Sequence, residues 1–330
     1  MRVAIIGCGL IGQKRARALG GHRLVAVADK QILLARKLSE AHKDHPSAGD
    51  DWRSVVGRDD VDLVIVATTN DALAAISLAA VEAGKHVLVE KPAARSSAEL
   101  EPVARAAEAK GVVVKVGFNH RFHPAPWKAK ELFDSGELGP LMFIRGRYGH
   151  GGRVGYEKEW RADPAIAGGG EMLDQGVHLI DLARWFAGDF VHVAGQVGTF
   201  FWDMPVEDNG FALLTTEAGQ VAFLHASCSE WKNLFCLEIY GRTGKLQIDG
   251  LGGSYGVERL SFYKMLPQMG PPPTTIWEFP GEDISWRAEF DHTIACIEGK
   301  TRCIGDVQDA LASLRIVEKL YAMPKLNPRK

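Results

Sequence analysis

An aspartate and a histidine stand four residues apart in a segment that is otherwise mostly apolar, GGGEMLDQGVHLIDLARWF, residues 168–186. If this segment is helical, Asp174 and His178 lie on one line that continues through Asp181, because each residue advances an α-helix by about 100°. The apolar flanks predict a buried helix, in which an unpaired carboxylate is costly. The polar line therefore either satisfies itself inside the core or faces a cavity where a substrate hydroxyl completes its hydrogen bonds.

A glycine-rich turn, Gly7-x-Gly9-x-x-Gly12, links a short apolar strand at residues 3–6 to a helix. The first glycine allows the tight turn, the second lets a pyrophosphate approach the backbone, and the third lets helix and strand pack closely. The start of the helix then offers N–H groups and a positive dipole end to that pyrophosphate. This motif predicts a dinucleotide site in the first third of the chain.

The second strand, LVAVAD, ends at Asp29, seventeen residues after Gly12. This spacing is close to the about 20 residues that usually separate the last glycine of the motif from a ribose-binding carboxylate. A carboxylate there accepts a hydrogen bond from the ribose 2′-hydroxyl and repels a 2′-phosphate, which favours NAD over NADP. Because the neighbouring Lys30 would tolerate that phosphate, NADP remains an alternative, although a less favoured one.

Strands and helices alternate through residues 1–120, which predicts an α/β dinucleotide-binding domain with a doubly wound parallel sheet. Ligands of such sheets bind outside the carboxyl ends of the strands. One strand end there carries the tripeptide Glu90-Lys91-Pro92, whose lysine is either a group of the ligand site or a plain surface residue. The candidate cofactor-binding residues at these ends are Gly7, Gly9, Leu10, Ile11, Gly12, Asp29, Lys30, Thr68, Thr69, Asn70, Glu90, Lys91 and Asn119.

Residues 121–330 follow a different pattern and are predicted to form a second domain that binds substrate and oligomerises. Strand-like runs joined by the turns EAGQ and GRTGK predict antiparallel hairpins. In QVAFLHASC, residues 220–228, we expect one face to pack on the helix of Asp174 and the other to meet a second subunit. The proline-rich stretch 264–281 is expected to be an irregular binding loop or dimer arm. Two helices, around 285–298 and 306–322, are predicted near the C-terminus.

The composition is that of an ordinary globular protein, with 46% hydrophobic and 24% charged residues. A net charge of −2 gives no reason to expect nucleic acid or an anionic membrane as a partner. No apolar run approaches the ~20 residues of a membrane span, and we expect no signal region, because the sequence starts almost directly in an apolar strand. The five cysteines are scattered, so neither a metal site nor a disulfide framework is expected, and a reduced cytoplasmic compartment fits best.

The motifs GCGLIG, EKP, WRADP, GGGEMLDQGVHLIDLARW and DALASLRIVEKLY resemble, in this order, the glucose–fructose oxidoreductase / inositol dehydrogenase / MocA family. The resemblance spans nearly the whole chain. It implies a Rossmann domain followed by an α+β domain with a large, mostly antiparallel open sheet, through which homodimers or homotetramers form. It also implies an NAD(P)-dependent oxidoreductase acting on a secondary alcohol or ketone of a sugar, cyclitol or sugar nucleotide.

The resemblance assigns roles to residues of three motifs. It makes Lys91, Asp174 and His178 catalytic, and it places Trp160 and Arg161 near the nicotinamide end of the cofactor. His178, with a reference pKa of about 6.5, suits the acid–base role. We expect Lys91 to stabilise developing alkoxide charge, and Asp174 to orient the substrate hydroxyl or Lys91. Asp181, one turn further on, is expected to be structural, either anchoring the helix or pairing with a nearby arginine.

Substrate identity is the least constrained expectation. Cations in segments expected to border the site are either solvated or available to a phosphate or carboxylate of the substrate; they are Arg121, Arg147, Arg153, Lys158 and Arg161. Tyr148, Tyr156 and Trp160 either stack on a sugar or fill the core. The predicted substrate-binding residues are Lys91, Arg121, Tyr148, Arg153, Asp174 and His178.

Three functions remain open from the sequence. The first is a reversible NAD-dependent sugar or cyclitol dehydrogenase. The second, a chemistry known in the resembled family, is an NAD-retaining glycoside hydrolase that oxidises its sugar only transiently. The third is a non-catalytic sugar and cofactor sensor, which would be expected to lack Lys91 or His178, whereas both are present.

Overall fold

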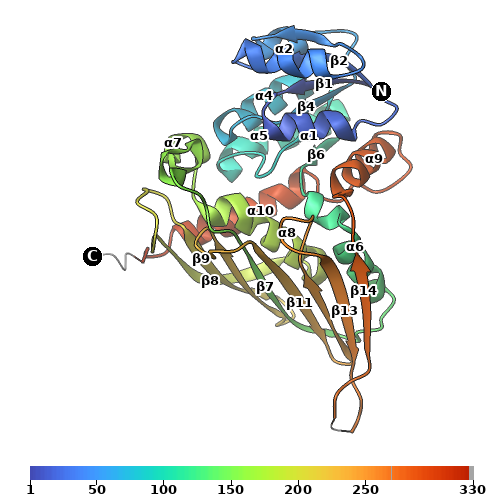
Figure 1. The fold of residues 1–330 in the computed structure, drawn as a ribbon, viewed down its shortest axis with the longest axis vertical. Coiled ribbons are helices and arrows are strands. Elements are labelled where there is room, and N and C mark those ends of the chain that lie inside the picture. The colour runs from blue at the N-terminus through green and yellow to red at the C-terminus, as the bar shows by residue number, and fades with distance from the viewer. Residues whose placement is uncertain (269, 327–330) are drawn as a thin grey trace. The chain divides into compact units, whose positions relative to one another are not determined.

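The computed structural model describes residues 1–268 and 270–326 (Figure 1). The chain divides into two compact units. The first comprises Met1–Phe118 together with Trp286–Leu311, and the second comprises Asn119–Ser285 together with the chain from Ala312 on. The sequence places a single boundary after residue 120, whereas in the structure a late segment returns to the first unit.

The first unit contains a six-stranded parallel sheet in the order β3-β2-β1-β4-β5-β6. This is the strand order of doubly wound dinucleotide-binding domains, so the predicted fold class is confirmed for this unit. The strands are β1 Arg2–Ile6, β2 Arg23–Ala28, β3 Ser47–Gly49, β4 Leu63–Val66, β5 His86–Val89 and β6 Val114–Val116. The helices are α1 Leu10–Ala18, α2 Ile32–Ala41, α3 Trp52–Val56, α4 Asn70–Glu82, α5 Ser97–Lys110 and α9 Ser285–Ile297.

Helix α9 belongs to this unit because its apolar face completes the unit's core. Phe290 is fully buried and Ile294 nearly so, in one cluster with Val3 and Ile5 of β1. Burial of a phenylalanine contributes about 1.5–3 kcal/mol relative to leaving it exposed, which is sufficient to fix where this helix packs. A sequence read in chain order does not show this return.

The second unit contains an eight-stranded sheet in the order β14-β13-β12-β11-β7-β10-β9-β8. Neighbouring strands are antiparallel except β7 and β10, which are parallel. The predicted EAGQ and GRTGK hairpins are confirmed as the β9–β10 and β11–β12 turns. The strands are β7 Leu141–Gly149, β8 Phe190–Gly198, β9 Asn209–Thr216, β10 Val221–Ser227, β11 Leu234–Gly241, β12 Gly244–Asp249, β13 Glu258–Lys264 and β14 Thr274–Phe279.

Helices cover one face of this sheet (Figure 1). They include α6 Pro124–Asp134, α8 Val177–Ala187 and α10 Val307–Tyr321. On β10, Ala222, Leu224 and Ala226 are buried against this layer, as the sequence predicts. The opposite face is open, since Phe223 of β10 and Leu213 of β9 are each 46% exposed.

The proline-rich stretch 264–281 is not wholly irregular, so that prediction is wrong for part of it. Residues 274–279 form the edge strand β14, which pairs antiparallel with β13. Its sequence, TTIWEF, is rich in β-branched and aromatic residues, which favour a strand once a partner is available. Met269 of this stretch lies outside the described residues.

Among the helices of the described ranges, none combines the length and apolar character needed to cross a bilayer.

Candidate active site

The glycine turn has the geometry that its motif predicts. Gly7 has φ +95°, and a Cβ on it would lie 2.3 Å from the Ala67 carbonyl oxygen. A Cβ on Gly12 would lie 2.0 Å from the Gly7 carbonyl oxygen, so only glycine fits either position. Gly9, by contrast, has no atom within 4 Å of a Cβ position.

The space at Gly9 lies at the start of α1. Gly9 is the N-cap residue of this helix, and it provides no side-chain hydrogen bond to the first N–H groups. Leu10, the first helical residue, is 71% exposed, and Ile11 is half-buried. Backbone N–H groups that no side chain caps at a helix N-terminus can bind the pyrophosphate of a dinucleotide.

Asp29 follows β2 and its carboxylate is fixed against the glycine turn. Oδ2 accepts a hydrogen bond from the Cys8 N–H at 2.8 Å, and Oδ1 accepts one from the Gln31 N–H at 2.8 Å. Lys30, the next residue, is exposed. A carboxylate oriented in this way fits the ribose hydroxyls of NAD.

The ends of β4 and β5 carry the next predicted cofactor residues. Thr68 and Thr69 precede α4, whose first residue, Asn70, is buried. Thr69 donates a hydrogen bond from Oγ1 to Asp71 at 2.6 Å. After β5, the Glu90 carboxylate accepts a 2.6 Å hydrogen bond from Arg15, and the half-buried Lys91 follows.

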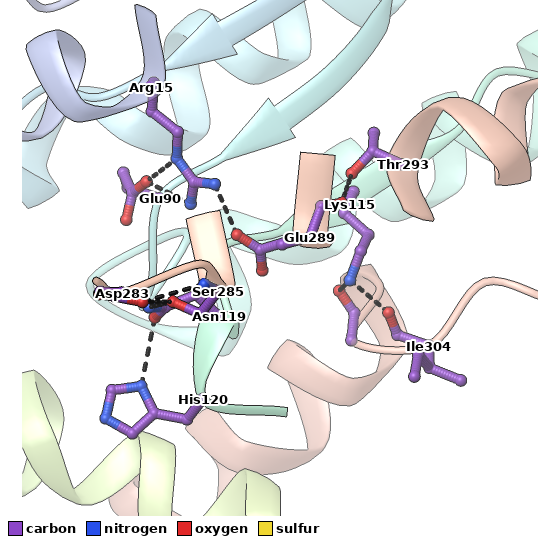
Figure 2. A network of polar contacts seen from close by, with 11 residues as sticks. Arg15, Glu90, Lys115, Asn119, His120, Asp283, Ser285, Glu289, Thr293 and Ile304 are labelled. Atoms are coloured by element: carbon purple, nitrogen blue, oxygen red, sulfur yellow. Dashed lines mark hydrogen bonds and ion pairs between the residues drawn. The ribbon is translucent and has the colours of Figure 1, made fainter. Parts of the chain in front are cut away.

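The second unit begins at Asn119, whose side-chain amide is engaged on both sides. Its Nδ2 donates to Ser285 Oγ at 2.9 Å, and its Oδ1 lies 3.2 Å from His120 Nδ1 (Figure 2). Asn119 and His120 belong to the short helix η1, Asn119–Phe122. The amide of this predicted cofactor residue therefore orients the His120 ring.

The helix that carries Asp174 does not keep α geometry, so the prediction of uniform 100° spacing is wrong there. Residues Met172–Gly176 (η4) form a π-helical segment that leads directly into α8. A π turn bonds each residue to the fifth one along instead of the fourth, and such segments are frequent at functional sites. Asp174 lies inside this segment, whereas His178 is the second residue of α8.

A buried carboxylate from another segment accepts hydrogen bonds from N–H groups at the start of this helix. Glu207 accepts hydrogen bonds from the N–H groups of Gly170 and Met172, each at 3.1 Å, and from the Tyr321 hydroxyl at 2.6 Å. A Cβ on Gly170 would lie 2.0 Å from the Glu207 carbonyl oxygen. The glycines at 168–170 therefore allow a second segment to approach and cap the helix.

The His178 ring is 3% exposed and packs among aromatic side chains. It stacks on the ring of His120, with centroids 3.7 Å apart and an interplanar angle of 22°. Tyr148 lies against both rings, at centroid distances of 5.1 Å from His120 and 6.2 Å from His178.

Asp174 pairs with Arg161, the residue that the resemblance places beside the cofactor. Arg161 Nε donates to Asp174 Oδ2 at 3.2 Å, and the guanidinium lies 4.5 Å from the ring centroid of Trp160. Burial lowers the pKa of Arg161, but the charge of Asp174 and the neighbouring Tyr156 outweigh it and raise that pKa. The structure thus brings Trp160 and Asp174 together around the guanidinium of Arg161, which keeps its positive charge.

Glu171 is a residue of this site that the sequence interpretation missed. It is 2% exposed, and its Oε1 lies 3.6 Å from His150 Nε2. Burial raises the pKa values of Tyr148, Tyr156 and Tyr255, and the carboxylates of Glu171 and Asp174 raise them further. Both carboxylates therefore act on the same three phenols.

Two other residues, His120 and Tyr255, were also missed. Glu171 lies inside the quoted GGGEMLDQ motif, so its charge on an apolar helix was a usable signal. His120 and Tyr255 carried none, since they join the site only through the fold.

Most of the predicted cations are paired with carboxylates. Arg121 is 2% exposed, and its Nε and Nη2 donate to Asp181 at 2.7 and 2.6 Å. Asp181 is thus structural, as predicted. Arg153 pairs with Glu159 at 2.7 Å. The remaining two, Arg147 and Lys158, are exposed.

Comparison with known proteins bears on this arrangement. Residues 1–118 match the model of the oxidoreductase family with an NAD-binding Rossmann fold, and residues 127–247 match the GFO/IDH/MocA C-terminal domain. The inositol 2-dehydrogenase/D-chiro-inositol 3-dehydrogenase of Shouchella clausii is 30% identical over 258 residues, which cover 75% of this chain and 72% of that protein. The chain belongs to the Gfo/Idh/MocA family. The predicted family and its NAD-binding Rossmann domain are therefore confirmed.

Other members of the Gfo/Idh/MocA family match over less of their length. Levoglucosan dehydrogenase of Pseudarthrobacter phenanthrenivorans is 30% identical over 239 residues, 66% of this chain and 59% of that protein. This chain spans about three fifths of the length of the curated relatives that it matches first. A solved structure of levoglucosan dehydrogenase with NADH and levoglucosan shares the fold, with TM-score 0.86 over 97% of both chains at 24% identity.

Proposed function

We propose that this chain is an NAD-dependent oxidoreductase that interconverts a secondary alcohol and a ketone on an uncharged sugar or cyclitol. The observation that carries the proposal is the helix 171–187, which holds His178 in an aromatic stack and Asp174 on Arg161 within one unit. Family membership supports the proposal, because relatives are named dehydrogenases of levoglucosan and inositol.

The first unit would hold the cofactor through its own backbone and one carboxylate. The N–H groups at the bare start of α1 would bind the pyrophosphate over Gly9, and Asp29 would accept hydrogen bonds from the ribose hydroxyls. When bound, NAD supplies the hydride acceptor. Arg161 and Trp160 would line the nicotinamide end.

Three side chains of the protein would act on the substrate, two of them on the hydroxyl that is oxidised. His178 would take its proton, because an imidazole exchanges a proton near neutral pH. The Lys91 ammonium would stabilise the developing alkoxide and relay the proton. Asp174, held by Arg161 at 3.2 Å, would accept a hydrogen bond from a neighbouring hydroxyl and orient the ring. In the reverse direction His178 would return the proton to the ketone oxygen.

An uncharged substrate follows from the charges around Asp174. Arg121 is matched by Asp181, Arg153 by Glu159, and Arg161 by Asp174. The buried Glu171 adds negative charge, which would repel a phosphate or carboxylate of the substrate. Carboxylates and phenols in this combination bind hydroxyl groups well, since one accepts and the other both accepts and donates.

The test is a screen of uncharged sugars and cyclitols, beginning with levoglucosan and inositol, followed by absorbance at 340 nm with NAD and with NADP. Sugar phosphates, uronic acids and nucleotide sugars form the comparison set. The proposal expects NADH to form in step with oxidation of a neutral ring, and His178→Ala to slow this reaction strongly. Glycoside cleavage without net NADH would instead identify a hydrolase, and binding without turnover would identify a sensor.

We also propose that the open face of the eight-stranded sheet binds a second copy of the chain. Large apolar side chains stand exposed on it, including Phe143, Leu213 and Phe223 at 36%, 46% and 46%. Exposed apolar groups gathered on one face are typical of an interface between subunits. Light scattering should give a dimer or tetramer for the wild type and a smaller species for Phe223→Asp. A wild-type monomer at micromolar concentration would contradict this pairing.

A reducing compartment, the cytoplasm, is the location that we propose. All five cysteines are free, and burial raises the pKa of Cys236 to about 11 and of Cys8 to about 12. Such thiols stay protonated and resist oxidation. Fractionation of the source cells with an antibody against the chain would test the location.

A further inference from the structure

A buried ion network includes Glu90, which follows β5 and directly precedes Lys91 (Figure 2). Arg15 of α1 is fully buried, three residues after Gly12. Its Nε donates to Glu90 Oε1 at 2.6 Å, and its Nη1 donates to Glu289 Oε2 of α9 at 2.5 Å. One guanidinium thus joins the glycine-turn helix, the end of β5 and the returning helix α9 within the first unit.

The surrounding residues are shaped to fit this network. A Cβ on Gly117 would lie 2.8 Å from Arg15 Nη2 and 2.9 Å from Glu90 Oε2, so glycine leaves the room that the pair occupies. The Trp286 ring covers the guanidinium at 4.6 Å from its centroid. Lys115 donates from Nζ to the carbonyl oxygens of residues 304 and 305, which anchors the chain after α9.

The charges of the network depend on one another. Burial raises the pKa of Glu289, and the charges of Arg15 and Lys115 oppose that rise. Burial also lowers the pKa of Arg15, but the carboxylates of Glu90 and Glu289 outweigh this effect, so that the pKa of Arg15 is raised overall. Buried ion pairs rarely add stability over well-packed apolar residues, so stability alone is a weak reason for this one.

Glu90 is held at its backbone as well as its side chain. Its N–H donates to the Val66 carbonyl at 2.9 Å, and its carbonyl accepts from the Ala93 N–H at 2.9 Å. The residue directly before Lys91 is therefore fixed at its N–H, its carbonyl and its carboxylate. Its carboxylate also points to Arg15 in the interior, so a positioning role suits Glu90 better than the predicted contact with the cofactor.

We propose that Arg15 and Glu289 are positioning residues: Glu289 holds the Arg15 guanidinium, which in turn holds Glu90 and so fixes the backbone from which the Lys91 ammonium projects. The inference rests on the proposed function only for what Lys91 does there. It makes helix α9, which comes from the last fifth of the chain, part of the machinery that sets the reactivity of Lys91.

The direct test measures the reactivity of Lys91 without any substrate. The full chain is labelled briefly with acetic anhydride, and the extent of acetylation of each lysine is read by mass spectrometry, with the exposed Lys110 as internal reference. Glu289→Gln removes one charge of the network and should raise the labelling rate of Lys91 by at least about threefold, because a loosened segment opens more often. Lys110 should not change.

The matched control is Asp291→Asn, which removes a carboxylate from the same helix at an exposed pair with Arg287. It should leave Lys91 labelling at the wild-type rate. Arg15→Lys is the second variant, because it keeps the charge but loses the fork that holds two carboxylates at once. Wild-type labelling of Lys91 in folded Glu289→Gln and folded Arg15→Lys would overturn the inference, and so would an equal rise in Asp291→Asn.

A kinetic cycle separates positioning from general support of the fold. If Glu289 acts through Lys91, Glu289→Gln lowers kcat in the wild type but has little further effect on a Lys91→Ala background. KM for NAD should stay within about twofold in both backgrounds. Equal losses of kcat in the two backgrounds would overturn the inference. Wild-type kcat in Lys91→Ala would instead remove Lys91 from the proposed function and leave the labelling result standing.

Discussion

The imidazole of His178 lies face to face with that of His120, at a centroid distance of 3.7 Å and an angle of 22°. Both rings are buried, and His120 is held from its other side by Asn119. Two charged imidazoles would repel at this distance, so the stack disfavours a charge on both rings at once. The stack also fixes the orientation of the His178 ring, which the proposed mechanism requires of a general base.

Replacement of His178 by alanine should lower kcat by ~10²–10⁴ while NADH still binds, because acid–base catalysis contributes about that factor. Steady-state rates at 340 nm and a fluorescence titration with NADH measure the two quantities. His192→Ala, at an exposed position on β8, is the control and should retain wild-type kcat. Full activity in His178→Ala would remove the imidazole from the mechanism.

Asp181→Asn should destabilise the second unit by about 3–5 kcal/mol, because it leaves the Arg121 charge buried without its carboxylate. Urea unfolding followed by tryptophan fluorescence gives the free energy. The comparison is the pair of Arg184 with Asp189, whose carboxylate is exposed to solvent: Asp189→Asn should cost less than about 1 kcal/mol. Similar losses of unfolding free energy in the two variants would show that the Arg121–Asp181 pair contributes no more to stability than the Arg184–Asp189 pair.

Much of this arrangement could be predicted from the sequence wherever the signal is local. The glycine turn, Asp29 and the parallel sheet follow from spacings of a few residues and from strand–helix alternation. The pairing of Asp181 with an arginine followed from the cost of burying its charge. The sequence predicted neither the π-helical segment around Asp174 nor the Glu207 carboxylate that caps the start of this helix from a distant segment. Helix α9 was predicted as a helix, but its return to the first unit was not, since the core that Phe290 completes is built from the other end of the chain.

Asp29→Ala should weaken NADH binding by about tenfold, because the ribose loses a carboxylate acceptor. NADPH binding should improve, since the repulsion of its 2′-phosphate is removed. Titration of each dinucleotide against protein fluorescence gives both constants. Lys30→Ala is the companion variant and should weaken NADPH more than NADH. An unchanged ratio of the two constants in Asp29→Ala would mean that Asp29 does not select the cofactor.

Glu238 should contribute stability that disappears in acid. Burial raises its pKa, but hydrogen bonds from Lys245, Arg145 and Tyr240 outweigh that and lower it from 4.5 to about 2. Because the folded pKa lies below the unfolded value, the contribution is complete above pH 4.5 and is lost as the pH falls towards 2.

The difference in unfolding free energy between wild type and Glu238→Gln should therefore shrink as the pH falls through that window. Glu217→Gln, at an exposed turn, is the control for the loss of a carboxylate. A difference that stays constant from neutral pH to pH 2 would contradict the assignment.

The central claim is that the Lys91 ammonium and the His178 imidazole act on one and the same substrate hydroxyl. The most direct measurement is a crystal structure of the NADH complex soaked with the neutral alcohol that the screen identifies. We predict one ring hydroxyl whose oxygen lies within about 3.2 Å of both Lys91 Nζ and a His178 ring nitrogen. A bound alcohol with every hydroxyl more than about 6 Å from either group, well beyond hydrogen-bond reach, would contradict the account.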